Sequence, residues 1–222
     1  LTAYGYFNQK APAGGGAERQ LHLLSTQLTE SFDVHIVVGD YGQPAIEHRE
    51  GVTLHRAYEP RPDRSAIGKP LEFIKLLQAM RRADADVYVY RGNPWKASIV
   101  YVLSKLLGGN WVYNLANDAN VSDQPDDLPK PIRLVFECAL SDADGIIAQT
   151  DYQAEKLRER FGVAATVVPN GYPAPDSRNS HDERGGFIWV GRRDKHQKRP
   201  HLFLDLAERL PQYDFLLIGP DG

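Results

Sequence analysis

The sequence lacks the features that mark secreted, membrane-spanning or nucleic-acid-binding proteins. It contains a single cysteine, Cys138, which excludes an internal disulfide framework and favours a reducing compartment. No apolar run approaches the ~20 residues that a transmembrane helix needs, and no secretory signal peptide is visible. The net charge of -3 is not that of an electrostatic nucleic-acid binder. These absences favour a cytoplasmic protein that does not bind nucleic acid.

The motifs of several common enzyme classes are also missing. The glycine-rich segment 12–16 has neither the Gly-x-Gly-x-x-Gly spacing of a dinucleotide site nor the Walker A spacing of a P-loop. No Gly-x-Ser-x-Gly elbow is present, which argues against an α/β-hydrolase. The histidines show no metal-ligand spacing. Asp-x-Asp occurs at 84–86 and 142–144, but each pair precedes a strand and so lies at the edge of a sheet where ligands do not bind. We expect both pairs to be solvated turns, and we expect neither a metal nor a cofactor.

The chain has 222 residues, which suits one large domain or two small ones, and 42% of them are hydrophobic, enough for a packed core. Short apolar runs alternate with amphipathic segments, and Thr150 and Gln153 fit a capping box at the start of one of the helices. This alternation predicts an α/β fold with a mostly parallel, doubly wound sheet of six or seven strands up to about residue 170. The expected strands are 1–4, 34–38, 52–55, 87–90, 111–115, 145–148, 166–168, 187–190 and a last one from 216.

A domain boundary is expected after Pro169-Asn-Gly-Tyr-Pro173, which breaks regular structure and leads into a polar stretch. We therefore predict an N-terminal domain over 1–172, a linker over 173–185 and the beginning of a second domain over 186–222. Both ends look truncated. The chain starts without methionine, as though a first strand had lost its opening residues, and it ends on a strand with an uncovered sheet edge.

A cationic loop joins the first strand of the second domain to a helix that opens at Pro200. Arg192 and Lys198 stand in this loop, between the carboxyl end of the strand and the helix N-terminus. Ligands bind at that edge of an open α/β sheet, and two cations beside a helix dipole suit a diphosphate. The alternative is that the charges of this loop only keep it solvated.

The first domain offers a second set of candidate ligand-binding residues. Gly15 and Gly16 lie between a strand and a helix, the layout of a phosphate cradle, although such a segment can also be a turn and nothing more. Arg91 follows the strand 87–90, and Asn117 and Asp118 follow the strand 111–115. The polar stretch 119–130 is long enough for a mobile functional loop.

The amphipathic helix expected to begin near Ile67 carries several cations on its polar face. They suit peripheral contact with anionic lipid, or they form an ordinary solvated face. These cations are Lys69, Lys75, Arg81 and Arg82.

Three strings together resemble a known enzyme family. They are Val-Gly-Arg…Lys-Arg-Pro at 190–200, Gly-Gly-Ala-Glu-Arg at 15–19 and Pro-Asn-Gly at 169–171. In their order along the chain and their spacing, these strings are similar to those of the retaining, nucleotide-sugar-dependent glycosyltransferases of the GT-B fold, the large "group 1" family. The resemblance implies that Arg192 and Lys198 stabilise the leaving diphosphate.

The resemblance also implies roles for the first domain. Gly15 and Gly16 would face the donor phosphates or the acceptor, and Asn170 and Gly171 would belong to the hinge string beside the cleft. Arg91 occupies the place where the family usually has a histidine that contacts the sugar. With Asn117 and Asp118 it is a candidate for the sugar and acceptor side.

The expected activity is transfer of a sugar from an NDP-sugar to a hydroxyl acceptor, with retention, in polysaccharide or glycoconjugate biosynthesis. The acceptor could be a sugar, a lipid-linked glycan or a small molecule, and the oligomeric state is left open. The chain stops before the two glutamates that hold donor ribose and sugar in the family, so we expect these 222 residues alone to be inactive. Two alternatives remain: a GT-B nucleotide-sugar epimerase, and a non-catalytic fragment that binds an acceptor or partner.

Overall fold

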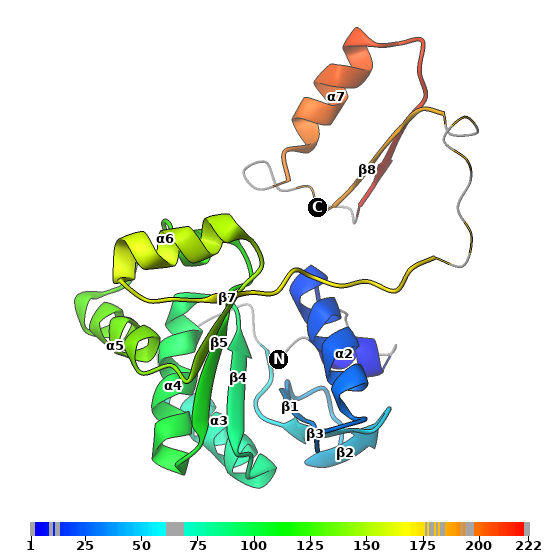
Figure 1. The fold of residues 1–222 in the computed structure, drawn as a ribbon. Helices are drawn as coiled ribbons and strands as arrows, with labels where there is room; N and C mark the ends of the chain where they lie inside the picture. Colours follow the sequence, from blue (N-terminus) through cyan, green and yellow to red (C-terminus); the bar gives the residue numbers. More distant parts are fainter. Residues whose placement is uncertain are drawn as a thin grey trace. The chain divides into compact units, whose positions relative to one another are not determined.

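The computed structural model divides into two compact units, Leu1–Tyr172 and Pro173–Gly222 (Figure 1). It describes residues 3–8, 11, 14–60, 69–175, 177, 180, 182, 185–191, 193 and 198–219. The helices of the first unit are α1 (Tyr4–Phe7), α2 (Gly16–Leu28), α3 (Lys69–Ala83), α4 (Pro94–Leu107), the 3-10 helix η2 (Asp118–Asn120), α5 (Lys130–Ser141) and α6 (Asp151–Phe161). Its strands are β1 (His35–Val38), β2 (Ile46–Arg49), β3 (Val52–Arg56), β4 (Val87–Arg91), β5 (Asn110–Asn114), β6 (Gly145–Ala148) and β7 (Thr166–Val167). The second unit contains β8 (Phe187–Val190), α7 (Pro200–Arg209) and β9 (Phe215–Ile218).

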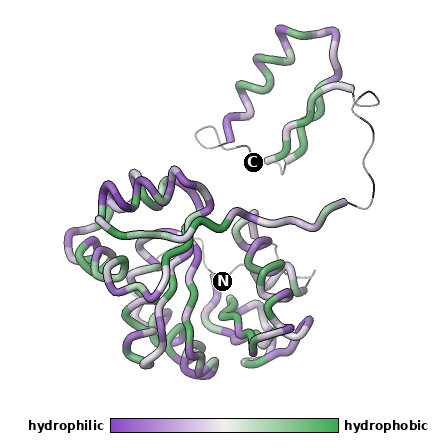
Figure 2. Tube along the Cα trace, in the orientation of Figure 1, coloured by the Kyte–Doolittle hydropathy of each residue, from purple (hydrophilic) through white to green (hydrophobic). Residues whose placement is uncertain are grey.

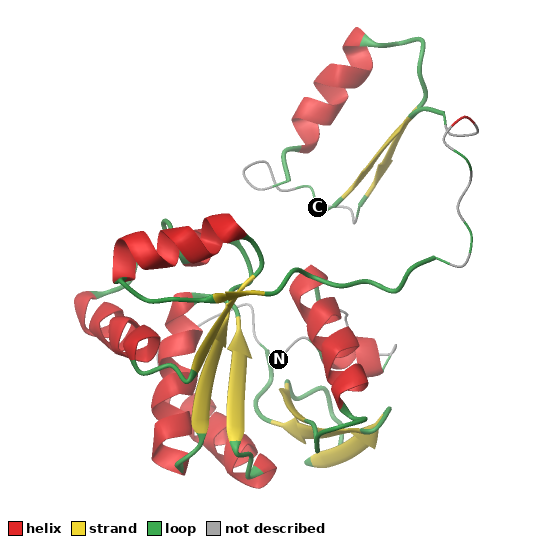
Figure 3. Ribbon diagram, in the orientation of Figure 1, coloured by secondary structure: helices red, strands yellow, loops and turns green. Residues whose placement is uncertain are grey.

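The predicted α/β class is confirmed, with helices packed on mostly parallel strands (Figure 3). The larger sheet of the first unit has the order β4-β5-β6-β7, and all its neighbours are parallel. The expected single sheet of six or seven strands is wrong, because β1, β3 and β2 form a separate three-stranded sheet. Both sheets nevertheless share a core, since Val37 of β1 packs against the cluster of Met80, Tyr88 and Leu103.

The smaller sheet contains an antiparallel hairpin that the sequence analysis missed. β2 pairs antiparallel with β3, and Arg49 lies opposite Val52. The two residues between them, Glu50 and Gly51, have φ values of 50° and 78°. Two successive left-handed residues make the tight turn that suits a hairpin.

The expected first strand is also wrong. Tyr4–Phe7 forms the short helix α1, and residues 1 and 2 lie outside the described part of the chain. The helical turn places Tyr4 and Phe7, three residues apart, against the buried side chains of β1 and β3. Burial of this aromatic pair explains why a helix forms here.

The main core of the first unit lies around β5. Trp111, Tyr113 and Leu115 are fully buried and pack against Phe136 of α5 and Leu157 of α6. The indole Nε1 of Trp111 donates to the carbonyl oxygen of Ala139 at 2.9 Å, so this buried polar group is satisfied. Hydrophobic residues follow the strands, whereas α6 is largely hydrophilic (Figure 2). The core fixes the position of β5, whose carboxyl end forms part of the site below.

In the residues that the structure describes, the second unit has a parallel pair of strands, β8 and β9, and the helix α7. Phe187 lies opposite Phe215 in the β8–β9 register, and Phe203 of α7 packs edge-on against Phe215. No helix in the part of the chain that the structure describes is long and apolar enough to cross a bilayer.

Candidate functional site

The carboxyl ends of the parallel strands in the larger sheet gather several polar side chains at one edge. Arg91 ends β4 and lies opposite Asn114, which ends β5. Gln149 follows β6, and Asn170 follows β7 after two further residues. The N-termini of α4 and α6 lie at the same edge, where Asn93 and Thr150 accept from backbone N–H groups of the first turns. Helix N-termini add positive potential, so this edge suits an anionic ligand.

A chain of side-chain hydrogen bonds joins Arg91 to the hinge string. Nη2 of Arg91 donates to Oδ1 of Asn170 at 2.9 Å, and Nδ2 of Asn170 donates to Oε1 of Gln149 at 2.8 Å. Nε2 of Gln149 donates to the carbonyl oxygen of Leu115 at 2.7 Å. Asn170 is thus held from two sides, between the ends of β4 and β6.

A second amide extends this network to Asp118. Gln153 is buried, accepts from the backbone N–H of Gln149 at 2.9 Å and donates to Oδ1 of Asp118 at 2.9 Å. Its own N–H donates to Oγ1 of Thr150 at 3.3 Å. One half of the expected capping box is therefore present, while the glutamine side chain reaches Gln149 rather than Thr150. Asn117 lies beside Asp118, and its N–H donates to Oδ1 of Asn120 at 3.2 Å.

The segment expected to be a mobile loop is fastened by Arg160 of α6. Nη2 of Arg160 donates to both carboxylate oxygens of Asp126 at 2.8 Å, and Nη1 donates to the carbonyl oxygens of Val121 and Ser122. Bidentate pairs of this kind fix geometry as well as charge. This segment therefore has a defined conformation beside Asp118.

The glycine-rich segment 14–16 leads into α2, and α2 bonds to the hinge string at the same edge. The Tyr6 hydroxyl donates to the carbonyl oxygens of Gly14 and Gly15, at 2.9 and 3.1 Å. Gly16 is the first residue of α2, and a Cβ built there would meet no atom within 4 Å. Nε2 of the buried Gln20 donates to the carbonyl oxygen of Gly171 at 2.8 Å. The start of α2 is therefore tied to the hinge string.

The cations of the second unit are described only in part. Arg192 lies outside the described residues, as does Lys195. Lys198 is described, and its carbonyl oxygen accepts from Nε1 of Trp189 in β8 at 3.2 Å. Arg199 follows with φ of 48°, and Pro200 opens α7. Lys198 therefore stands between β8 and a helix N-terminus.

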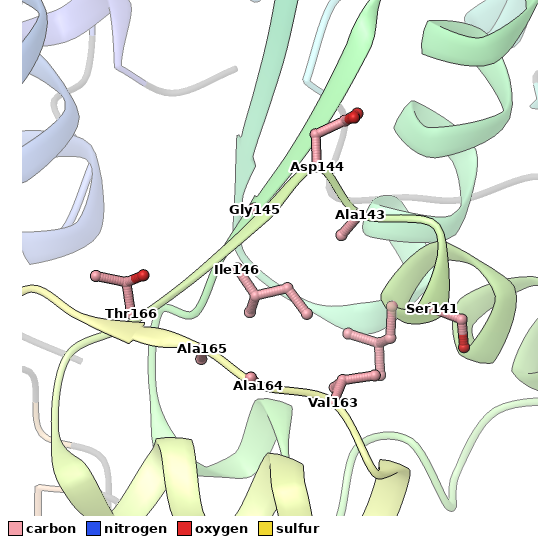
Figure 4. A pocket seen from close by; sticks show the side chains of 10 residues that line it. Ser141, Ala143, Asp144, Gly145, Ile146, Val163, Ala164, Ala165 and Thr166 are labelled. Carbon is pink, nitrogen blue, oxygen red and sulfur yellow. The ribbon is translucent and has the colours of Figure 1, made fainter.

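A hollow of about 380 Å³ lies at the opposite edge of the larger sheet (Figure 4). It is lined by Asp144, Gly145 and Ile146 at the start of β6 and by residues 163–166 leading into β7. Ligands bind outside the carboxyl ends of such strands. This hollow lies at the other edge of the sheet, so it is not a candidate ligand site. The nearby acidic pair is structural, because Asp144 accepts from the N–H of Trp111 and Asp142 accepts from the Tyr101 hydroxyl, both at 2.8 Å. The expectation that these aspartates are only solvated turns needs that correction.

The structure brings five of the predicted residues to the carboxyl edge of the first unit. Arg91, Asp118, Asn170 and Gly171 take part in the hydrogen bonds described above, and Asn117 adjoins Asp118. The carbonyl oxygen of Gly15 accepts from the Tyr6 hydroxyl. Gly16 starts α2 at the end tied to Gly171. Asn114, Gln149, Gln153 and Gln20 were missed, because single amide side chains give no motif in a sequence. In the described part of the chain, no three His, Cys, Asp or Glu side chains are grouped to hold a metal ion.

The fold and this edge define an α/β protein with a polar edge at the carboxyl ends of its parallel strands. The chain belongs to Glycosyltransferase Family 4, whose family model matches residues 14–174, more than half of the sequence. The resemblance to GT-B glycosyltransferases is thereby confirmed for the first unit. No curated protein matches the chain significantly in sequence.

Three solved structures have a fold similar to that of this chain. Sucrose-phosphate synthase from Thermosynechococcus elongatus has a TM-score of 0.68 at 16% identity, over 94% of this chain and 58% of that one. Anabaena HepE in complex with UDP-glucose has a TM-score of 0.61 at 16% identity, over 92% of this chain and 57% of that one. HepE in complex with UDP and glucose has a TM-score of 0.59 at 18% identity, over 91% of this chain and 57% of that one. The chain thus spans less than two thirds of these proteins, and identities this low show the fold alone.

Proposed function

We propose that the protein is a glycosyltransferase that moves a sugar from a nucleoside diphosphate sugar to a hydroxyl acceptor, with retention of configuration. The observation that carries this proposal is the polar carboxyl edge around Arg91, which lies inside the segment that the family model matches. The edge provides a cation, amides and an acidic group at the place where ligands of such sheets bind. No metal and no cofactor enters the proposal.

The proposed donor is a UDP-sugar. Anabaena HepE, a protein of similar fold, has been solved with UDP and with UDP-glucose. In this chain Arg192 and Lys198 would bind the diphosphate, and their positive charge would stabilise it as it leaves. Lys198 supports this role because it lies between a strand end and the start of α7.

The proposed acceptor side is the first unit. Arg91, Asn117 and Asp118 would orient the acceptor or the transferred sugar, while Gly15 and Gly16 leave room for a ligand beside the start of α2. Asn170 and Gly171 would hold the hinge string at this edge through their bonds to Arg91, Gln149 and Gln20.

The test is incubation of the full-length protein with UDP-glucose labelled in the sugar, with and without a panel of hydroxyl acceptors. A transferase moves label to an acceptor and releases UDP in equal amount. Conversion of the donor to another UDP-sugar without an acceptor would instead identify an epimerase. A donor that binds but stays intact with every acceptor would identify a binding protein.

The glycine at position 16 gives a test of the acceptor side. We expect Gly16→Val to weaken ligand binding at least several-fold while the melting temperature changes little, because the space that a Cβ would enter is open and belongs to the proposed site. Binding of donor and acceptor by calorimetry, together with thermal unfolding, measures both effects.

Gly108 provides the matched control. It also has open space around it, but it caps the far end of α4 with φ of 78°. Gly108→Ala should lower the melting temperature without changing affinity, because a side chain is strained at that φ. A Gly16→Val protein with unaltered affinity and reduced stability would show that Gly16 serves only the turn.

We also propose a cytoplasmic location with peripheral membrane contact through α3. Its first half exposes Leu71, Phe73 and Ile74, next to Lys75. Apolar side chains beside cations suit an anionic bilayer surface. We expect flotation with phosphatidylglycerol vesicles but not with phosphatidylcholine vesicles, and Leu71→Ser with Ile74→Ser should reduce it. Flotation that ignores both lipid charge and these substitutions would contradict this contact.

A further inference from the structure

Arg91 has fewer partners than its burial demands. Its guanidinium is partly buried and makes one side-chain hydrogen bond, from Nη2 to Asn170. The Nε atom is buried without any partner. Among the described residues no carboxylate lies within ion-pair distance of it, although Arg49, Arg56 and Arg133 of the first unit each pair with a carboxylate. A desolvated cation without a counter-charge costs free energy, so this position favours an anion.

The immediate surroundings of Arg91 are neutral amides. Asn114 lies opposite it in the register, is buried, and has an Oδ1 atom without a hydrogen-bond partner. Burial lowers the pKa of Arg91, and the more distant Tyr172 and Glu18 only partly offset this effect. The neighbouring strand end thus supplies an amide and no carboxylate, so it gives the charge of Arg91 no counter-charge.

The terminal nitrogen Nη1 of Arg91 is the part of the guanidinium that an anionic ligand can reach. Nη1 makes no hydrogen bond to the residues that the structure describes, and it is not among the buried atoms without a partner, so it reaches solvent. Asn170 holds the other terminal nitrogen, which fixes the plane of the group. A guanidinium with a fixed plane suits the oxygens of a phosphate or carboxylate.

We propose that Arg91 binds an anionic group, a phosphate or a carboxylate, carried by the acceptor. This inference rests on the proposed glycosyltransferase function and adds the substrate class. The acceptor is the bearer of the anion because Arg91 belongs to the first unit, whereas the donor diphosphate is assigned to Lys198 and Arg192 of the second. A neutral sugar at this position would leave the charge unpaired.

The first experiment measures binding to the 222-residue chain by calorimetry. The probes are glucose 6-phosphate, glucuronate and glucose, which share a ring and differ in charge. We expect one or both anionic probes to bind at least 10-fold more tightly than glucose. A phosphate-bearing acceptor is indicated if only glucose 6-phosphate gains, and a carboxylate-bearing one if only glucuronate gains. Equal affinity for all three probes overturns the inference.

Variants separate binding by Arg91 from a structural role at the hinge. Arg91→Met should remove the preference for the anion, a loss of roughly 10–100-fold, since a hydrogen bond to a charged group contributes about 1.5–3 kcal/mol. Asn170→Ala cuts the tether to the hinge and keeps the charge, so most of the preference should survive. Arg158→Met removes an exposed cation from the last turn of α6 and should change nothing. Equal losses in Arg91→Met and Asn170→Ala would show that Arg91 acts only through the hinge, and would overturn the inference.

Failure of this inference is distinguishable from failure of the proposed function. Transfer from UDP-glucose to a neutral acceptor, at a rate that Arg91→Met does not change, would refute the anionic acceptor and leave the transferase intact. Absence of UDP-glucose consumption by the full-length protein with every acceptor would instead refute the transferase.

Discussion

Replacing Lys198 with alanine should lower turnover by on the order of 10²–10³ in a preparation that transfers sugar. The diphosphate gains negative charge as the sugar departs, and a fixed cation at that position stabilises the transition state more than the ground state. Lys198 is placed for this because it follows β8, and the helix N-terminus at Pro200 comes two residues later. Arg192→Ala should have an effect of the same size. Steady-state rates under saturating donor measure both.

The same loop provides matched controls. Arg193→Ala and Lys195→Ala remove equal charge from neighbouring positions and should reduce turnover far less, because neither cation is assigned to the diphosphate. Thermal unfolding of each variant shows that the lost rate does not follow from lost folding. Small and equal effects of all four substitutions would favour a solvated loop. A donor complex with its phosphates away from Lys198 would refute the assignment directly.

Some helices carry local sequence signals at both ends. The helix α4 has Asn93 as its N-cap, Pro94 at its first position and Gly108 in the left-handed conformation at its end. The helix α6 begins at Thr150 and stops at Gly162, which has φ of 69°. Caps act over a few residues, so a sequence shows them without knowledge of the fold.

The failures are elements whose conformation depends on distant partners. The helix α1 forms because Tyr4 and Phe7 bury against β1 and β3, which begin only at His35 and Val52. The strand β2 exposes most of its side chains, so it lacks the apolar alternation that marks a strand. Its local sequence signal is the Glu50-Gly51 turn, whose two residues have φ values of 50° and 78°.

The candidate site was predictable at strand ends and not beyond them. Arg91 and Asp118 follow apolar runs, and the carboxyl ends of parallel strands must meet at one edge. Gln149 and Gln153 are ordinary residues in the sequence, and only the fold shows that they join Asn170 to Asp118. Hydrogen bonds across 21 or 35 residues of separation follow from the packing of β6 and α6.

The first unit should lose stability on acidification because of His55. This side chain in β3 is 1% exposed, and burial together with the neighbouring His35 lowers its pKa to about 4. Its Nε2 lies 2.8 Å from Nδ1 of His35, with the two rings stacked. Arg82 and His48 disfavour the charged form further, and only Asp33 opposes them.

The sign of the effect follows from proton linkage. In the unfolded chain the pKa of a histidine is about 6.5, so between pH 6.5 and 4 the unfolded state binds more protons than the folded state. The stability that neutral His55 preserves is therefore present above pH 6.5 and is lost as pH falls toward 4, to a total of about 2–3 kcal/mol. Urea unfolding at pH 7, 6, 5 and 4.5, followed by the fluorescence of the buried Trp111, measures the slope.

His55→Leu should flatten that slope, because leucine fills a similar volume and binds no proton. His48→Gln is the control: His48 is exposed on β2 and contacts Thr53, so its removal should leave most of the pH dependence in place. The substitution also affects the free energy of unfolding at pH 7. His55 has a buried Nδ1 without a partner, and leucine removes that unpaired atom. We expect His55→Leu to be no less stable than the parent at pH 5. A slope that persists unchanged in His55→Leu and disappears in His48→Gln would assign the acid sensitivity to the exposed histidine.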